Sequence, residues 1–133
     1  MIERDYLMRM IAQLAAVLAK ILFAKKSQNY AEALLLTQNA YAQLLGLNGE
    51  LVEKMEAATL TLLLGDKEKI KALATLLQEE GEVLHLQGKF AESKAKDEKA
   101  LALFQEALRR YPAGDTECDA AIAALQSKLS EGM

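Results

Sequence analysis

The sequence contains no Trp, and only one Pro, one Cys and one His occur among its 133 residues. A single Cys excludes an intramolecular disulfide framework and any zinc site made of several cysteines, and it suits a reducing compartment. Aromatic residues make up only 5% of the chain, and β-branched residues are also few. Because these residues build strands, a β-sheet protein is effectively ruled out.

Leu and Ala dominate the composition instead. They contribute 25 and 23 residues, and both are strong helix formers. A chain of this length fits one domain, residues 1–133, and is long enough to bury an ordinary hydrophobic core without disulfides or metal. The composition therefore predicts a single all-α domain.

The charges are balanced. Sixteen basic residues stand against nineteen acidic ones, which gives a net charge of −3 and a pI near 5.3. Neither half of the chain has a strong excess of basic residues, so the electrostatic footprint of a nucleic-acid-binding protein is missing. We expect no nucleic-acid partner.

The most apolar segment, residues 6–24, has to be considered as a membrane span. It contains Arg9 and Lys20, and its longest charge-free run covers only residues 10–19. A span needs about 20 predominantly apolar residues. The first five residues also include two acids where a secretory signal has a basic region. We therefore expect a mostly buried helix of a soluble, cytoplasmic protein with no membrane partner.

Apolar residues recur at helical spacing along almost the whole chain, and polar or glycine-containing turns separate the periodic segments. Six helices are expected, over residues 3–26, 30–45, 50–64, 67–87, 90–111 and 116–129. Their short connections predict antiparallel neighbours. Asp66 is the expected N-cap of the fourth helix, and Pro112 ends the fifth. The inner face expected for the third helix is Leu51, Met55, Ala58 and Leu62.

Two of these helices begin with similar sequences. Tyr30-Ala31-Glu32-Ala33 and Phe90-Ala91-Glu92-Ser93 lie sixty residues apart, and each follows a polar or glycine turn. An aromatic residue followed three positions later by a small residue resembles the start of the second helix of a tetratricopeptide repeat. Gly81 and Gly88 match that repeat's glycine in its first helix and its turn glycine. Ala100, Phe104, Ala107 and Pro112 match the residues that close the repeat. They lie about two helical turns later than a 34-residue unit allows.

The tetratricopeptide resemblance covers about half the chain and implies an architecture. It predicts six antiparallel helices in a tetratricopeptide-like array, a fragment of an α-solenoid or right-handed superhelix, in which Gly81 lets two helices approach closely. The helix expected at 50–64 has no counterpart in the repeat. The chain also resembles a family of small bacterial proteins of uncharacterised function, over its whole length and notably in residues 1–11, 44–47 and 80–82. That family carries no assigned catalytic residue.

The only pattern suggestive of chemistry is Glu82-x-x-His85, whose spacing places both side chains on one side of a helix. Di-iron carboxylate bundles use such pairs from two helices, but this chain has one His, so a second pair would come from another subunit. The charged residues of 79–82 and 94–99 are expected on solvated faces. Cys118 is expected on the inner face of the last helix, without a His to activate it. We therefore expect no catalytic residue, no metal and no cofactor.

The lack of a chemical motif favours a non-enzymatic scaffold that binds a protein, a peptide or a second copy of itself. The alternative is a metal-dependent enzyme or di-metal carboxylate protein that uses Glu82 and His85. The tetratricopeptide resemblance implies a concave binding side lined by first helices. The residues that it places there are Thr75, Gln78, Glu82, His85, Ala15, Leu18, Leu22 and Lys25. In a monomer Ala15, Leu18 and Leu22 would be exposed to solvent. We therefore expect the last helix, a partner peptide or, as the favoured case, a second copy in a homodimer to cover them.

Overall fold

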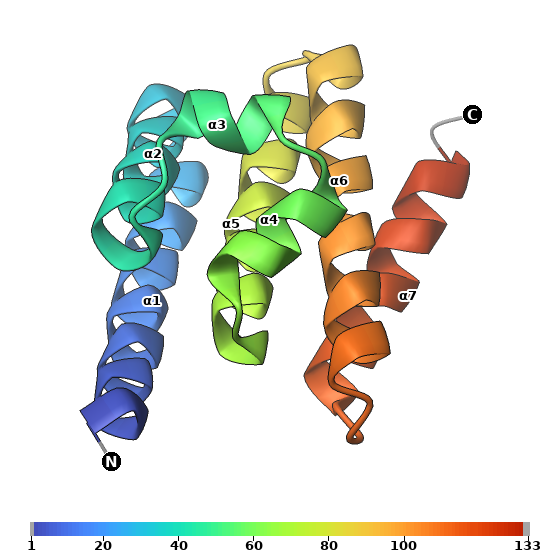
Figure 1. The fold of residues 1–133 in the computed structure, drawn as a ribbon. Helices are drawn as coiled ribbons and strands as arrows, with labels where there is room; N and C mark the ends of the chain where they lie inside the picture. The colour runs from blue at the N-terminus through green and yellow to red at the C-terminus, as the bar shows by residue number, and fades with distance from the viewer. Residues whose placement is uncertain (1, 132–133) are drawn as a thin grey trace.

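The computed structural model describes residues 2–131, with side chains from residue 4 onward. The helices are α1 (Ile2–Lys26), α2 (Tyr30–Leu45), α3 (Gly49–Lys54), α4 (Ala57–Leu64), α5 (Lys67–Leu86), α6 (Phe90–Arg110) and α7 (Thr116–Glu131) (Figure 1). No strand occurs among the described residues, so the all-α prediction is confirmed. The described chain has seven helices where six were expected.

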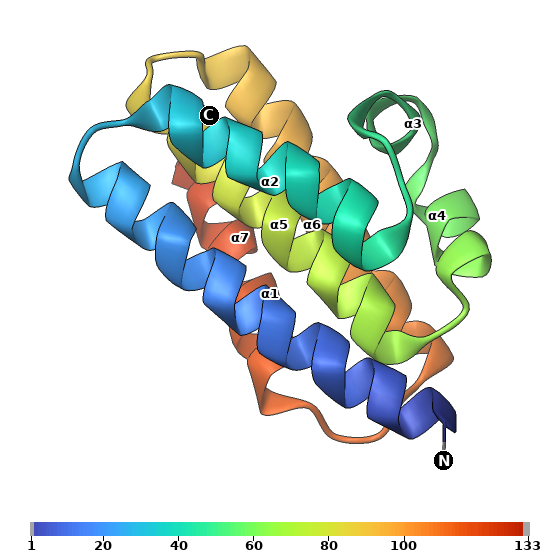
Figure 2. The same ribbon diagram turned by 90° about the vertical axis from the view of Figure 1, so that its left-hand side faces the viewer.

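The helices form two antiparallel hairpins. α1 and α2 make the first hairpin, and α5 and α6 make the second (Figure 1). The hairpins pack together mainly where α2 meets α5, with a smaller contact between α1 and α5. α7 runs back along α6, whereas α3 and α4 connect the hairpins and lie on the side away from α1 in Figure 2. α5 is therefore the central helix of the molecule.

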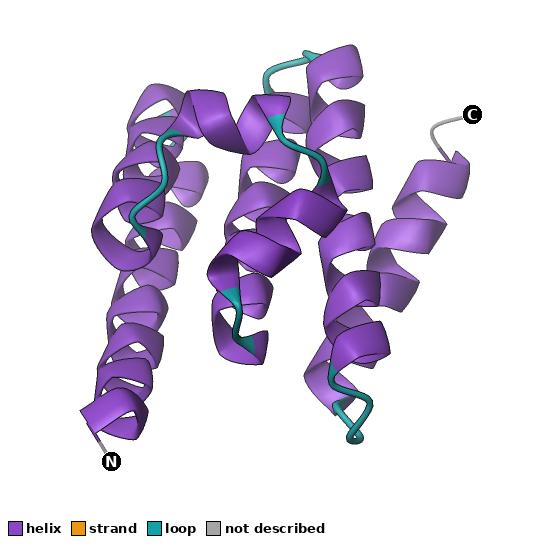
Figure 3. Cartoon of the chain, viewed as in Figure 1, coloured by secondary structure: helices purple, strands orange, loops and turns teal. Residues whose placement is uncertain are grey.

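The additional helix arises because the segment expected as one helix, residues 50–64, breaks at Met55 and Glu56. Both residues have extended backbone, with ψ values of 143° and 155°, and Figure 3 shows the short loop between α3 and α4. The expected inner face is wrong, since Leu51 and Leu62 are exposed. The buried residues are instead Val52, Leu60, Thr61 and Leu64. Each short helix faces its own neighbours, so no single apolar stripe runs through both.

The turns that close the two hairpins have the same backbone structure, sixty residues apart. In both, the residue with positive φ, Gln28 or Gly88, donates its N–H to the carbonyl three residues earlier. The next residue donates to the carbonyl five residues earlier. Buried small residues follow at the same separation, as the pairs Ala33 and Ser93, and Ala40 and Ala100. The similarity seen in the sequence thus extends to local structure.

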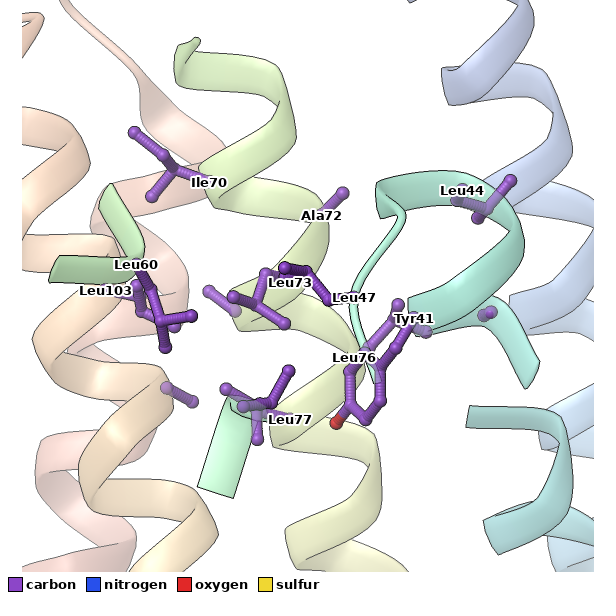
Figure 4. Close-up of a cluster of buried hydrophobic side chains, with 14 of the residues drawn as sticks. Tyr41, Leu44, Leu47, Leu60, Ile70, Ala72, Leu73, Leu76, Leu77 and Leu103 are labelled. Carbon is purple, nitrogen blue, oxygen red and sulfur yellow. The ribbon is translucent and has the colours of Figure 1, made fainter. Parts of the chain in front are cut away.

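The hydrophobic core lies around α5, between the two hairpins and under α4 (Figure 4). Along α5 the fully buried side chains include Ile70, Leu73, Leu76 and Leu77. Tyr41 of α2, Leu60 of α4 and Leu103 of α6 belong to the same cluster. The core therefore joins α2, α4 and α6 to one helix, and the polar sites described below lie at the edges of these contacts.

α1 is the helix that departs most from expectation. It buries Met10, Ile21 and Ala24, but only 17% of the residues in its most apolar 18-residue window are buried. The expectation of a mostly buried helix is therefore wrong, because α2 and α5 cover only one side of α1. Figure 2 views the molecule with α1 in front. By length and composition, α1 is the one helix of the described chain that could cross a membrane.

Candidate functional site

An ion-pair network joins two of the residues predicted for the concave side. The ammonium of Lys25, on α1, lies 2.7 Å from Glu79 Oε1 and 3.1 Å from Glu82 Oε2, both on α5. The Lys25 side chain is almost fully covered, whereas Glu82 remains exposed. Lys25 and Glu82 are thus brought together, and their charges attach α1 to α5.

Three of the predicted residues, Gln78, Glu82 and His85, line a cavity of about 300 Å³ between α5 and α7. The wall from α7 consists of Ala124, Leu125 and Lys128. His85 is exposed and packs edge-on against the ring of Phe90, with 5.0 Å between the ring centroids. An apolar wall combined with amide, carboxylate and imidazole groups suits the binding of a polar chain segment.

The remaining predicted residues lie apart from this cavity. The Thr75 hydroxyl donates to the carbonyl of Lys71 within α5, at 2.8 Å. Leu18 is half-buried and packs against the core, although it was expected to be exposed to solvent on the concave side. Ala15 and Leu22 are exposed on α1. α7 does not cover them, because it packs along α6.

The alternative site, Glu82 with His85, gains no further ligand group from the fold. Among the described residues, no cluster of three His, Cys, Asp or Glu side chains could hold a metal ion. Cys118 is buried as predicted, its thiol donates to the carbonyl of Phe104 at 3.4 Å, and burial raises the pKa of that thiol. A thiol kept protonated in this way packs as a small apolar group.

Sequence reasoning missed a buried carboxylate at Glu80, which was expected on a solvated face and is only 3% exposed. Its oxygens accept hydrogen bonds from the Tyr41 hydroxyl and from Gln38 Nε2, the latter at 3.0 Å. Burial, together with the Glu80 carboxylate, raises the pKa of the Tyr41 hydroxyl, so Tyr41 remains a donor at any physiological pH. This network ties α2 to α5.

A cavity of about 510 Å³ opens beside Glu80, between α2, α3, α5 and α6. Its charged and polar lining consists of Gln38, Glu53, Glu80, Glu92, Lys96 and Lys99. The Lys99 ammonium donates to the carbonyls of Val52 and Glu53, both at 2.6 Å. Because those carbonyls lie in the last turn of α3, Lys99 stabilises the end of that helix and holds it near α6.

Asp97 is a second carboxylate that was expected in solvent, and it is 1% exposed between α5 and α6. Burial raises the pKa of its carboxyl, although Lys128 of α7, 2.8 Å from Oδ2, opposes this shift. The other oxygen faces Gly81, where the Cβ of any larger residue would meet it. The Ser93 hydroxyl donates to the Gly81 carbonyl at 2.6 Å. The close approach predicted at Gly81 is confirmed.

Comparisons with known proteins identify a family and no function. No curated protein matches the chain, and no solved structure matches it. A family model described as Family of unknown function (DUF6483) matches residues 1–128, which take in both hairpins and most of α7. The chain therefore belongs to this family of unknown function.

Proposed function

We propose that this protein is a non-enzymatic scaffold of tetratricopeptide-like architecture that binds protein or peptide partners. Two observations support the architecture: the antiparallel hairpins α1–α2 and α5–α6, and the equivalent turns that close them. In such an array α1, α5 and α7 are the first helices of successive units, and α3 with α4 is an insertion between two units. Partners then bind on the side formed by the first helices.

The exposed apolar surface of α1 carries the proposal. Five large hydrophobic side chains of this helix are exposed: Tyr6, Met8, Ile11, Leu22 and Phe23. Phe23 alone is 73% exposed and Met8 58%. Apolar surface kept in water costs about 25 cal/mol per Å², and proteins that act alone rarely expose a contiguous apolar patch of more than a few hundred Å². A surface of this kind is typical of a site that another protein covers.

The cavity between α5 and α7 supplies a separate, more polar surface. Gln78 and His85 present hydrogen-bonding groups there, and Glu82 keeps an exposed carboxylate although it pairs with Lys25. Lys25 pairs with both Glu79 and Glu82, so this network carries one net negative charge. We therefore propose that apolar contact on α1 provides most of the affinity and that the cavity contributes selectivity.

The proposal is tested by site-specific photo-cross-linking in cells that produce the protein. A photoreactive amino acid replaces Leu22, which is 48% exposed, or, as a matched control, Leu62 on α4, which is 64% exposed. Protein adducts of defined mass at Leu22 and none at Leu62 are the expected result. Equal labelling at both positions, or no protein adduct at Leu22, overturns the proposal. Circular dichroism spectra of both variants verify that the helices are intact.

A further inference from the structure

We infer, building on the proposed function, that a second copy of the chain covers the exposed side of α1 and that the two α1 helices pair in antiparallel orientation. The surface concerned is a stripe of exposed residues, the α1 stripe. It consists of Asp5, Met8, Ala12, Ala15, Ala16, Ala19, Phe23 and Lys26. At 3.6 residues per turn these positions occupy about 100° of the helix circumference. Ile11 and Leu22 lie along one edge of the stripe.

The α1 stripe has the same kinds of residue in the same order from either end. From each end, a charged residue is followed by a large apolar one and then by two alanines. The spacing also matches: Met8 lies three residues after Asp5, as Phe23 lies three residues before Lys26, and the alanines follow at equal distances. The two charges at the ends have opposite sign. Two copies of this stripe therefore bring opposite charges together only when the helices run in opposite directions.

Antiparallel pairing about a two-fold axis uses this symmetry. It places Asp5 opposite the partner's Lys26 and Met8 opposite the partner's Phe23, and the axis repeats each contact. The alanines meet at the centre, where small side chains let two helices approach closely. Ile11 and the partner's Leu22 then cover one edge of the contact. The exposed side chains of Met8, Ile11, Leu22 and Phe23 become buried in this contact.

The end charges disfavour a parallel arrangement of the same helices. A parallel pair would bring each Asp5 against the partner's Asp5 and each Lys26 against the partner's Lys26, and both contacts are repulsive. Arg4 does not reverse this preference, because at helical spacing it lies at the edge beside Ile11. The charge pattern therefore favours reversed copies.

A lipid surface fits the α1 stripe less well than a second copy does. Helices that lie on membranes combine basic residues with large apolar side chains that reach the acyl region. Here Asp5 lies on the stripe itself, and four alanines form its middle. Alanines bury little area in lipid, whereas they favour close packing of two helices.

Exchange of the two end charges tests the contact on the purified full-length protein, by sedimentation velocity over a range of concentrations. Asp5→Lys or Lys26→Asp alone should raise the dimer dissociation constant roughly 5- to 30-fold, because each replaces two attractive contacts per dimer by repulsive ones. The double variant should return to within about threefold of the wild type. Lys89→Asp, which makes the same charge change on an exposed residue before α6, should leave the constant unchanged.

Thermal melting separates this effect from a change in helix stability. Asp5 near the N-terminus of α1 and Lys26 at its C-terminus also interact favourably with the helix dipole. At a concentration where every variant is monomeric, the two substitutions should therefore lower the melting temperature additively. Recovery of the dissociation constant in the double variant despite that additive loss is the expected result. A double variant that dimerises as weakly as the single variants overturns the antiparallel contact.

Cysteine cross-linking reports the orientation directly. The variants Ala12→Cys and Ala19→Cys are oxidised separately and as a mixture, and Cys118 stays in place because it is buried. Antiparallel pairing brings residue 12 near the partner's residue 19, so the mixture should give more mixed disulfide dimer than either symmetric dimer. Dimers that form mainly within each variant alone overturn the inference.

Failure of the inference can be told apart from failure of the proposed function. A wild-type protein that stays monomeric at the highest attainable concentration, while Leu22 cross-links to a different protein, overturns the second copy and leaves the scaffold. Co-sedimentation of monomeric protein with vesicles of anionic phospholipid, without protein adducts at Leu22, overturns both. A concentration-dependent dimer that Leu22→Glu abolishes and Leu62→Glu preserves supports both.

Discussion

At the residue scale, two buried carboxylates show how much of this fold depends on polar contacts between helices. Glu80 is balanced by two neutral donors, and Asp97 by the ammonium of Lys128. A buried carboxylate without such partners would strongly destabilise the folded state. Each contact joins a neighbouring helix to the α5–α6 hairpin, α2 through Tyr41 and α7 through Lys128. The contacts of α2 with α5 and of α7 with α6 are therefore stabilised by polar groups as well as by apolar packing.

Replacement of Gly81 tests the close approach of α5 and α6. A Leu side chain there would meet Asp97 and the carbonyl of Ser93, which lies 3.4 Å from the position of a Cβ. Movement of Asp97 away from this position would disturb its ion pair with Lys128. Gly81→Leu should lower the free energy of unfolding by about 1–3 kcal/mol in urea titrations. Gly114→Leu is the matched control, since nothing lies within 4 Å of a Cβ there; equal effects of the two substitutions would contradict the prediction.

The two equivalent hairpin turns predict opposite effects when their residues are exchanged. Gln28 has φ 58°, a left-handed conformation that costs an L-residue about 1–2 kcal/mol. Gln28→Gly should raise the free energy of unfolding by about 0.5–1 kcal/mol, because the greater freedom of Gly in the unfolded chain offsets part of the relieved strain. Gly88→Gln should lower it by about 1 kcal/mol. Calorimetry that finds the same sign for both variants would mean that the turns are not equivalent.

At the element scale, helix ends were predictable wherever a local signal marks them. Asp66 caps α5 by accepting hydrogen bonds from two backbone N–H groups, and α6 ends at Arg110, just before Pro112. No glycine or proline marks the break between α3 and α4. That break is stabilised by contacts with distant residues, notably the Lys99 ammonium on the last carbonyls of α3. The sequence of the segment alone does not contain this information.

The candidate site was predictable in part. The tetratricopeptide resemblance placed Lys25 and Glu82 on one side, and the structure brings their charges within 3.1 Å. Glu80 and Asp97 were assigned to solvent because they are acidic, although both fall at helical intervals within the apolar stripe of their helix. A prediction that gave more weight to this helical spacing than to the acidic residue type would have placed both carboxylates in the interior. Their partners lie on other helices, so the contacts themselves could not be predicted without the fold.

Asp115 makes α7 sensitive to acid, because it lies at the start of that helix. Partial burial alone would raise the pKa of its carboxyl, but the N–H of Cys118 and the ammonium groups of Lys71 and Lys67, at 2.9 and 3.3 Å, outweigh this and hold the pKa at about 2. The folded pKa thus lies below the ordinary value of 3.8. The ionised group therefore stabilises the fold fully above about pH 4, and this stabilisation is lost as the pH falls through about 2.

The substitution Asp115→Asn tests this dependence. Asn removes the charge but keeps an oxygen that can accept the N–H of Cys118. The variant should be less stable than the wild type by about 1–2 kcal/mol at neutral pH, and the difference should vanish near pH 2. Urea denaturation at a series of pH values measures it. A difference that does not change with pH would contradict the ion pairs.

At the scale of the whole molecule, a contact between two copies links stability to concentration. If only folded chains associate, association stabilises the folded state by mass action. The melting temperature of the wild type should therefore rise with protein concentration in scanning calorimetry, and Leu22→Glu should remove this dependence. Leu62→Glu, the same change at an exposed position on α4, should preserve it. A wild-type melting temperature that is independent of concentration would contradict the prediction.

The packing of α2 on α5 also governs the order of events on the ribosome. Tyr41 lies 39 residues before Glu80, its hydrogen-bond partner on α5. At roughly 5–20 residues per second, the finished α1–α2 hairpin waits about 2–8 s for that partner to be synthesised. α5 and α6, joined by a short turn, can close as soon as both have left the tunnel. The N-terminal hairpin is therefore the part of the nascent chain that stays open longest, and neighbouring ribosomes on one messenger RNA would present such hairpins to one another before either chain is complete.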